Sequence, residues 1–295
     1  MPSYARPSSL QDALGLLAGG RGVALAGGTD LYPGAGAALA GDVVDLGGLA
    51  ELRGIAAAGS RIGGGLRIGG GLRIGAATTW SEIAETTNLP AALRGLQQAA
   101  LQVGGRQIQN TGTIGGNLCN ASPAADGVPP LLVLGAEVEL ASLAGRRRLP
   151  LPEFLLGVRQ TGLRPGEVLV AIWLPEASLR GVSAFVKLGA RAYLVISIAM
   201  VAVRIVVEAG RVAEAAVAVG ACSAVARRLV AVERALTGAP LAQAGARVLL
   251  ADVAAGLAPI DDIRASAAYR TDAAVELLRR AVSELVTDAI PVVVT

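Results

Sequence analysis

The amino-acid sequence predicts an α+β protein with two domains, and three observations lead to this class. The chain has 295 residues, which is longer than a domain with a single hydrophobic core usually is. Hydrophobic residues make up 53% of it and aromatic residues only 3%, so the cores should be aliphatic. From Ser183 onward, long apolar strands are followed by helices without alternation. This order predicts one antiparallel sheet with helices on one face.

The first half of the chain interleaves short strands with helices. Ser8 or Ser9 can act as the N-cap of a helix that ends before Gly19-Gly20. Short apolar runs predict strands at residues 22–25, 42–46, 137–141, 148–151 and 168–174. Apolar residues at helical spacing predict a helical turn at 49–53 and helices at 81–87, 90–101 and 129–134.

The second half contains longer strands, expected at residues 184–188, 197–207 and 212–219. Glu208-Ala209-Gly210-Arg211 supplies a hairpin turn between the last two. Helices are expected at 226–236, 241–255 and 272–287. Because residues 175–178 indicate a seam, the predicted domains are 1–177, in two parts of about 1–55 and 56–177, and 178–295.

Residue counts exclude several kinds of chemistry. The chain has no histidine, so Ser-His-Asp and Cys-His catalysis, histidine-ligated zinc and a histidyl-linked flavin are impossible within it. Cys119 and Cys222 are far apart and predict neither a disulfide framework nor a metal site. Any redox chemistry must therefore be carried by a cofactor.

Charge and hydropathy are typical of a protein without nucleic-acid or membrane contacts. The net charge is +3, and the longest basic run, Arg146-Arg147-Arg148, follows Ala144-Gly145, which indicates a solvated hairpin turn. The apolar stretch at 194–203 is too short to span a bilayer, and the N-terminus lacks the pattern of a secretory signal. We expect a cytoplasmic protein.

Two glycine-rich motifs are candidates for binding an anion. They are Gly27-Gly28-Thr29-Asp30 and Thr113-Ile114-Gly115-Gly116-Asn117. Paired glycines let backbone N–H groups approach phosphate oxygens, and threonine hydroxyls add donors. The alternative is that both motifs are ordinary turns. Neither matches the dinucleotide or the P-loop fingerprint, so a phosphate site here would belong to another fold.

With their flanking residues, these motifs resemble the FAD-binding medium subunit of the molybdenum hydroxylases, the family of xanthine, carbon monoxide and aromatic-compound dehydrogenases. The resemblance rests on residues 26–31, on 111–117 continuing into 121–126, and on segments around Glu167 and Lys187. It covers nearly the whole chain. It implies a two-part FAD-binding domain of the vanillyl-alcohol-oxidase (PCMH) type, followed by the C-terminal α+β domain.

The resemblance also implies which residues contact FAD, bound non-covalently. The expected diphosphate contacts are Ala24, Leu25, Ala26, Gly27, Gly28, Thr29, Asp30, Leu31, Thr113, Ile114, Gly115, Gly116 and Asn117. The further contacts expected are Val103, Asp126, Leu169, Lys187 and Tyr193. No residue is assigned a catalytic or metal-binding role.

Several of these residues have plainer interpretations. Asp126 could instead cap the helix that follows it, Lys187 by itself is typical of a surface lysine, and Tyr193 could lie at a strand edge. Cys119, inside the second motif, is expected to be a small buried hydrophobic residue.

The function implied by the resemblance is electron transfer. The FAD would take electrons from an iron-sulfur small subunit, after a molybdenum-cofactor large subunit oxidises the substrate, and pass them to an external acceptor such as NAD+ or quinone. A dimer of heterotrimers is expected. The alternative is a free-standing FAD oxidase or dehydrogenase with its own small substrate, a type that often has a histidyl flavin linkage.

A hexapeptide is duplicated at Arg61–Leu66 and Arg67–Leu72, and a third copy breaks off after Gly75. The repeat suggests a β-helix scaffold, but two and a half copies are too few to build one. We interpret it as a six-residue duplication in a hairpin turn, which preserves the alternation of the flanking strands.

Overall fold

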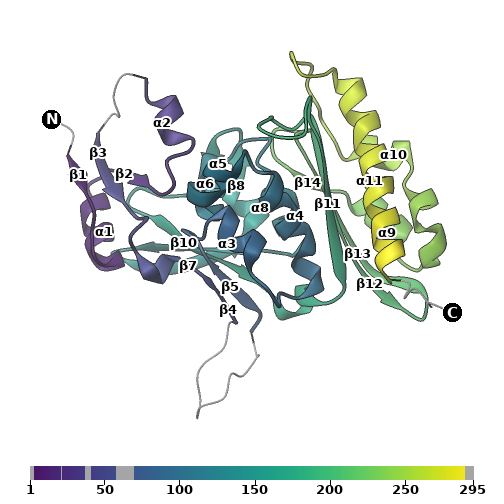
Figure 1. The fold of residues 1–295 in the computed structure, drawn as a ribbon, viewed down its shortest axis with the longest axis horizontal. Helices are drawn as coiled ribbons and strands as arrows, with labels where there is room; N and C mark the ends of the chain where they lie inside the picture. Colours follow the sequence, from purple (N-terminus) through teal and green to yellow (C-terminus); the bar gives the residue numbers. More distant parts are fainter. Residues whose placement is uncertain (1–2, 21, 37–40, 58–69, 290–295) are drawn as a thin grey trace, which may run out of the picture. The chain divides into compact units, whose positions relative to one another are not determined.

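The computed structural model describes residues 3–20, 22–36, 41–57 and 70–289. The chain divides into two compact units, each built from separate segments (Figure 1). The first unit comprises residues 1–85, 104–122 and 135–176, and the second comprises 86–103, 123–134 and 177–295. The second unit therefore includes two segments that precede the predicted seam at residues 175–178.

The first unit begins with a small parallel sheet. Its strand order is β1-β3-β2, with β1 at Tyr4–Ala5, β2 at Gly22–Leu25 and β3 at Asp42–Asp45. Helix α1 (Leu10–Leu17) begins at the predicted cap, because the Ser9 hydroxyl accepts a hydrogen bond from the Asp12 N–H at 3.1 Å. Its apolar face packs with Val44 in one core, which confirms the predicted helix and strands.

A five-stranded antiparallel sheet forms the larger part of this unit. Its order is β4-β5-β10-β6-β7. The strands are β4 (Ile55–Ala57), β5 (Leu72–Gly75), β6 (Glu137–Ser142), β7 (Gly145–Pro150) and β10 (Val168–Leu174). The predicted hairpin is β6 and β7, and the predicted strand at 168–174 is β10.

Short elements complete the first unit. They are α2 (Leu31–Gly34), η1 (Ala50–Leu52), α3 (Trp80–Glu85), α5 (Arg106–Thr111), α6 (Ile114–Asn120), α8 (Leu151–Phe154), β8 (Leu155–Gly157) and β9 (Gln160–Thr161). Trp80 of α3 is only 2% exposed, so it anchors this helix in the hydrophobic core.

The second unit is organised around a four-stranded antiparallel sheet of order β11-β12-β13-β14. The strands are β11 (Val182–Leu188), β12 (Ala199–Glu208), β13 (Arg211–Gly220) and β14 (Arg227–Arg228). The helical elements are η2 (Ala91–Leu93), α4 (Arg94–Gln102), α7 (Val128–Val133), η3 (Glu176–Leu179), α9 (Val230–Leu236), η4 (Leu241–Arg247), α10 (Leu250–Ala255) and α11 (Ala267–Ala289).

Helices pack on both faces of this sheet (Figure 1). Alternate residues such as Val201 and Val203 join a core with α9, α10 and α11, as predicted. On the opposite face, Ser183 accepts a hydrogen bond from the Gly95 N–H of α4 at 2.8 Å, and Arg204 donates to the Val133 carbonyl of α7 at 3.1 Å. The predicted α+β class is confirmed, and the second helical layer comes from the first half of the sequence.

Two expectations of helix need correction. Residues 226–236 divide into the short strand β14 and the helix α9, because β14 pairs with the end of β13. Residues 241–255 divide into η4 and α10, with Val248 in an extended conformation between them. None of the described helices is long and apolar enough to cross a membrane.

The arginine run lies on strand β7 rather than in a solvated turn. Arg146 forms an ion pair with Glu139 at 2.8 Å, and Arg147 pairs with Glu167. The guanidinium of Arg148 lies 3.5 Å from the centre of the Trp173 ring. The hairpin turn itself is at Leu143 and Ala144, and Arg146 and Arg148 are exposed, so the expected hairpin is present but the arginines lie on the strand that follows its turn.

The repeat falls largely outside the described residues, which resume at residue 70. The strands on either side of it, β4 and β5, pair antiparallel, with Ala57 opposite Leu72. The β-helix alternative is wrong, because β5 pairs with β4 and β10 in the five-stranded antiparallel sheet.

The bidentate pair between Arg147 and Glu167 predicts a pH-dependent stability. Both contacts are 2.7 Å, and the Arg147 guanidinium lowers the pKa of Glu167. A lowered pKa stabilises the folded state above the ordinary glutamate pKa, and this stabilisation is lost as the pH falls through the lowered value. Glu167→Gln should lower the free energy of unfolding at neutral pH by about 1–3 kcal/mol, measured by urea denaturation.

The exposed Glu153 supplies the control, Glu153→Gln, which should leave stability unchanged. The deficit of Glu167→Gln relative to wild type should shrink as the pH is lowered below about 4. A deficit that stays constant over this range would contradict the assigned pair.

Candidate functional site

The first glycine-rich motif lies between β2 and α2, and it touches the segment that precedes the second motif. A Cβ atom on Gly27 would overlap the carbonyl oxygen of Thr111 and would lie 2.9 Å from the Gly112 Cα. Only glycine permits this backbone approach. The sequence predicted both motifs separately, and the structure brings the first one against the residues directly before Thr113.

This first loop has backbone donors to offer a ligand. Within the described residues, the N–H groups of Gly27, Gly28 and Thr29 make no hydrogen bond. Gly28 has a φ of +69°, the left-handed region that favours glycine, and a Cβ there would overlap the Tyr32 ring. Successive free N–H groups on a glycine turn are suited to bind an anion.

The second motif is the beginning of a helix rather than a loop or an ordinary turn. Thr113 is the N-cap of α6, and its hydroxyl accepts a hydrogen bond from the Gly116 N–H at 3.0 Å. The N–H groups of Ile114 and Gly115 donate to the carbonyls of Thr78 and Ala76, at 3.0 and 2.8 Å. These backbone donors are therefore engaged within the protein.

The side chain of Asn117 is the polar group that this segment leaves available. Its Oδ1 atom is buried and has no hydrogen-bond partner within the described residues. A buried polar atom without a partner is costly, and a bound ligand that donates a hydrogen bond would remove that cost. The free donors of residues 27–29 suit phosphate oxygens, and the Asn117 Oδ1 acceptor suits a hydroxyl or N–H group, so together they fit a cofactor that carries both kinds of group.

Leu169 lies in β10 of the same unit and is 4% exposed. The pairing of β10 with β6 shifts register between Leu169 and Ala171, which marks a β-bulge. The carbonyl of Val170 at this bulge accepts a hydrogen bond from the Ala76 N–H at 3.1 Å. The bulge thus joins β10 to Ala76, which also binds Gly115.

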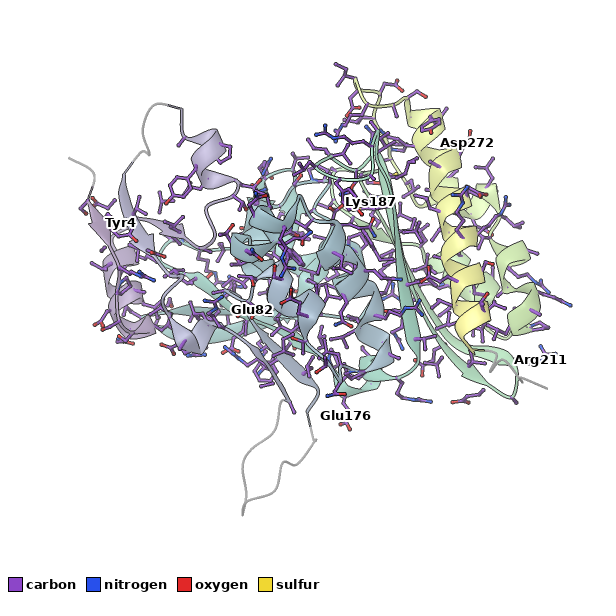
Figure 2. All side chains as sticks on the ribbon, in the orientation of Figure 1. Tyr4, Glu82, Glu176, Lys187, Arg211 and Asp272 are labelled. Atoms are coloured by element: carbon purple, nitrogen blue, oxygen red, sulfur yellow. The ribbon has the colours of Figure 1, made fainter. Side chains whose placement is uncertain are left out.

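In the second unit, Asp126 and Lys187 form a buried ion pair with a distance of 2.6 Å. The Ser197 hydroxyl donates to the other carboxylate oxygen at 2.6 Å, and Lys187 also donates to the Gln102 carbonyl at 3.3 Å. We call Asp126, Lys187 and Ser197 the Asp126 cluster; Figure 2 labels Lys187. Burial raises the pKa of Asp126, and the contacts with Lys187 and Ser197 oppose that shift.

The plainer interpretations of these two residues were wrong. Helix α7 has Gly127 as its N-cap, so Asp126 does not cap it. The side chain of Lys187 is 6% exposed, so it is not a surface lysine. Sequence reasoning also missed Ser197, whose contact spans 71 residues. One signal in the sequence could have drawn attention to Lys187: it is the single lysine of the chain.

The remaining sequence candidates differ in exposure. Val103 is the half-buried C-cap of α4. Tyr193 is 67% exposed in the segment between β11 and β12, so the strand-edge interpretation was wrong. Cys119 is exposed on α6, and the expectation that it is buried was wrong as well. Within the described part of the chain, no group of three potential ligands could hold a metal ion.

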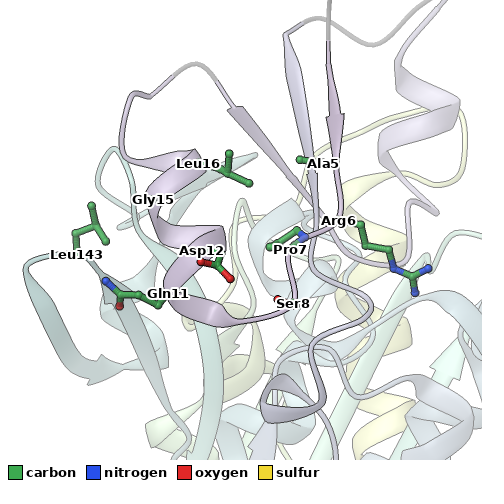
Figure 3. Close-up of a pocket in the computed structure, with 9 residues that line it drawn as sticks. All are labelled: Ala5, Arg6, Pro7, Ser8, Gln11, Asp12, Gly15, Leu16 and Leu143. Atoms are coloured by element: carbon green, nitrogen blue, oxygen red, sulfur yellow. The ribbon is translucent and has the colours of Figure 1, made fainter.

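A separate depression of about 640 Å³ lies beside α1 (Figure 3). It is lined by residues such as Gln11, Asp12 and Leu143, and none of the predicted site residues lines it. It is therefore distinct from the candidate cofactor residues.

The fold and these residues define the class of protein. The chain belongs to the family described as the FAD binding domain in molybdopterin dehydrogenase, whose model matches residues 1–177. Residues 184–285 match the CO dehydrogenase flavoprotein C-terminal domain. The resemblance seen in the motifs is confirmed.

Particular relatives agree with this assignment. The chain is 32% identical to the xanthine dehydrogenase FAD-binding subunit of Escherichia coli O157:H7, over 72% of this chain and 74% of that protein. It is 37% identical to the nicotinate dehydrogenase FAD-subunit of Eubacterium barkeri, over 42% of this chain and 43% of that protein. A chain of CO dehydrogenase from Oligotropha carboxidovorans matches with a TM-score of 0.86 and 30% identity, covering 98% of this chain and 99% of that one.

The close approach at Gly27 predicts that its replacement by alanine is damaging. Gly27→Ala should displace the backbone at Thr111, lower the free energy of unfolding by about 1–3 kcal/mol and weaken FAD binding. Gly34→Ala is the matched control, because Gly34 lies in the adjacent α2 and a Cβ added there would meet no atom of the described residues within 4 Å. Urea denaturation and FAD titration check both effects. Equal behaviour of the two variants would contradict the assigned contact.

The buried pair of Asp126 and Lys187 predicts a compensating double variant. Lys187→Met leaves a buried carboxylate without its cation and should cost about 3–5 kcal/mol of stability. Adding Asp126→Asn removes that charge, so the double variant should recover part of the loss. Urea denaturation of the four chains gives the coupling, and independent effects of the two substitutions would show that the pair is not formed.

Proposed function

We propose that this chain is the FAD-carrying electron-transfer subunit of a multi-subunit molybdenum hydroxylase. It would receive electrons from an iron-sulfur subunit and pass them to an external acceptor such as NAD+ or quinone, while a molybdenum-cofactor subunit oxidises the substrate. A dimer of heterotrimers in the cytoplasm is part of this proposal. The observation that carries it is the contact of Gly27 with Thr111, next to backbone donors at residues 27–29 and an Asn117 Oδ1 atom that have no hydrogen-bond partner among the described residues.

Each unit carries its own set of proposed FAD contacts. In the first unit these are residues 24–31 and 113–117 and Leu169, with the free N–H groups and the Thr29 hydroxyl donating to the diphosphate and Asn117 placed beside it. In the second unit they are Val103, Asp126, Lys187 and Tyr193. The Asp126 carboxylate would accept hydrogen bonds from cofactor hydroxyls.

The bound FAD supplies the chemistry, because it can accept electrons singly and release them as a pair. The chain's residues bind and orient it. Lys187 neutralises the buried Asp126 carboxylate by pairing with one of its oxygens, and the Ser197 hydroxyl donates to the other oxygen. These two contacts fix the orientation of the carboxylate. No described side chain needs to transfer a proton, in keeping with a chain that has no histidine.

The alternative, a free-standing FAD oxidase, requires a substrate site of its own. The C-terminal match over residues 184–285 is to a flavoprotein domain of CO dehydrogenase, which supports the subunit role. The organic substrate would then be bound by the partner subunit.

Purification of the chain with its native partners tests the proposal. The expected result is a visible flavin spectrum, release of FAD on denaturation, and co-purification of an iron-sulfur and a molybdenum subunit. With substrate, the flavin should become reduced and be reoxidised by the correct acceptor. A chain that binds no FAD contradicts the proposal, and a flavoprotein that oxidises a small substrate without partners supports the oxidase.

A further inference from the structure

Arg270 is a buried charged residue that the proposed FAD contacts do not include. It lies on α11, it is 1% exposed, and its Nη2 atom pairs with Asp262 Oδ1 at 2.6 Å. Contacts with Arg264 and Arg270 hold the pKa of Asp262 well below its ordinary value, so the carboxylate is charged. The two charges therefore pair as ions.

The other contacts of Arg270 cross the end of the sheet. Its Nη1 atom donates to the carbonyl of Ile198 at 2.6 Å and to that of Ala221 at 3.0 Å. Ile198 directly precedes β12, and Ala221 directly follows β13. From α11 on one face, the guanidinium thus reaches the edge of the sheet where β12 begins and β13 ends.

Ile198 and Ala221, whose carbonyls Arg270 contacts, are also connected to the segments that carry the Asp126 cluster. Ile198 follows Ser197, and its N–H donates to the carbonyl of Leu188, next to Lys187, at 2.8 Å. The N–H of Ala221 donates to the carbonyl of Pro123, three positions before Asp126, at 2.9 Å. The backbone segments that carry all three members of the cluster are therefore connected to Arg270 through Ile198 and Ala221.

The backbone at Ala221 adds a second reason to assign a positioning role. Its φ is +62°, a left-handed conformation that an alanine adopts at a cost. Such a conformation persists when the surrounding contacts fix it. Here the contacts are Pro123 on the N–H side and Arg270 on the carbonyl side.

Packing alone does not account for Arg270. Its Nε atom is buried without a partner in the described structure, which is unfavourable. A buried ion pair often contributes less to stability than apolar residues of the same volume would. The hydrogen bonds to the carbonyls of Ile198 and Ala221 therefore provide the reason for an arginine at this position.

We propose that Arg270 is a positioning residue for the cofactor site, which holds Ser197 and Asp126 in place through the carbonyls of Ile198 and Ala221. The inference rests on the proposed function, in which Asp126 contacts FAD. Among the described residues, the side chain of Arg270 hydrogen-bonds to Ile198, Ala221 and Asp262, none of which is a proposed FAD contact.

A double-mutant cycle with Ser197 tests this assignment. In the full chain, Arg270→Gln and Ser197→Ala should each weaken FAD binding about tenfold, the effect of one lost charge-assisted hydrogen bond. If Arg270 acts through Ser197, the double variant should bind FAD about as tightly as the single variant with the lower FAD affinity. Additive losses would overturn the proposal.

Arg204 offers a matched control. It is also buried, and it donates to two carbonyls, those of Val133 and Arg180, and to the Glu214 carboxylate. Arg204→Gln should cost stability in the same way, but its effect on FAD binding, combined with Ser197→Ala, should be additive. Coupling equal to that of Arg270 would show a general loss of structure and overturn the specific role.

A second measurement does not require FAD. Because Lys187 is the single lysine, an amine-acylating reagent with peptide mapping reports its accessibility directly. Arg270→Gln should accelerate acylation of Lys187 about tenfold, whereas Arg204→Gln should not. An unchanged rate in Arg270→Gln contradicts the positioning role. If the wild-type chain binds no FAD, the proposed function fails, and the acylation rate still decides the role of Arg270.

Discussion

The candidate site of the first unit depends on the close approach of the backbone at Gly27 to that at Thr111. No side chain fits between these two segments. The contact is held from the other side, because the Gly112 carbonyl accepts a hydrogen bond from the N–H of the buried Trp80 at 3.1 Å. The segment that precedes α6 is therefore fixed between the first loop and α3, and no described residue accepts a hydrogen bond from the N–H groups of Gly27, Gly28 and Thr29.

A different constraint organises the second unit, because several charged side chains are buried there and each needs a partner. Arg204, Arg270 and the pair of Asp126 and Lys187 all lie within its core or at its edge. Each has carbonyl or charged partners, as burial of charge requires. Arg204 and Arg228 donate to the carbonyls of Val133 and Leu132, so cations lie at the C-terminus of α7, where the helix dipole favours them. The helix that follows Asp126 is fixed at its far end by this arrangement.

Local sequence signals predicted most elements, and the exceptions have a common cause. Helix α1 follows from Ser9 and its apolar spacing, and β12 and β13 follow from long, largely apolar runs. Residues 113–117 were expected to be an anion-binding segment or an ordinary turn, because of their paired glycines. They form the start of α6, where Thr113 caps the helix, and Gly115 lies too close to Ala76 for any side chain, so a tertiary contact requires glycine despite its low helix propensity. Tertiary contact likewise decides the conformation of Arg227 and Arg228, which pair with β13 instead of extending α9.

The sequence by itself determined the family, the α+β class and the two glycine motifs, because these depend on residue types and on spacing along the chain. Only the tertiary structure decided which groups meet. Asp126 reaches Lys187 across 61 residues and Ser197 across 71. Such contacts depend on strand register and on which face of the sheet each residue occupies. Burial then decides the chemistry, because a lysine that would be solvated on a surface must pair with a carboxylate once water is excluded.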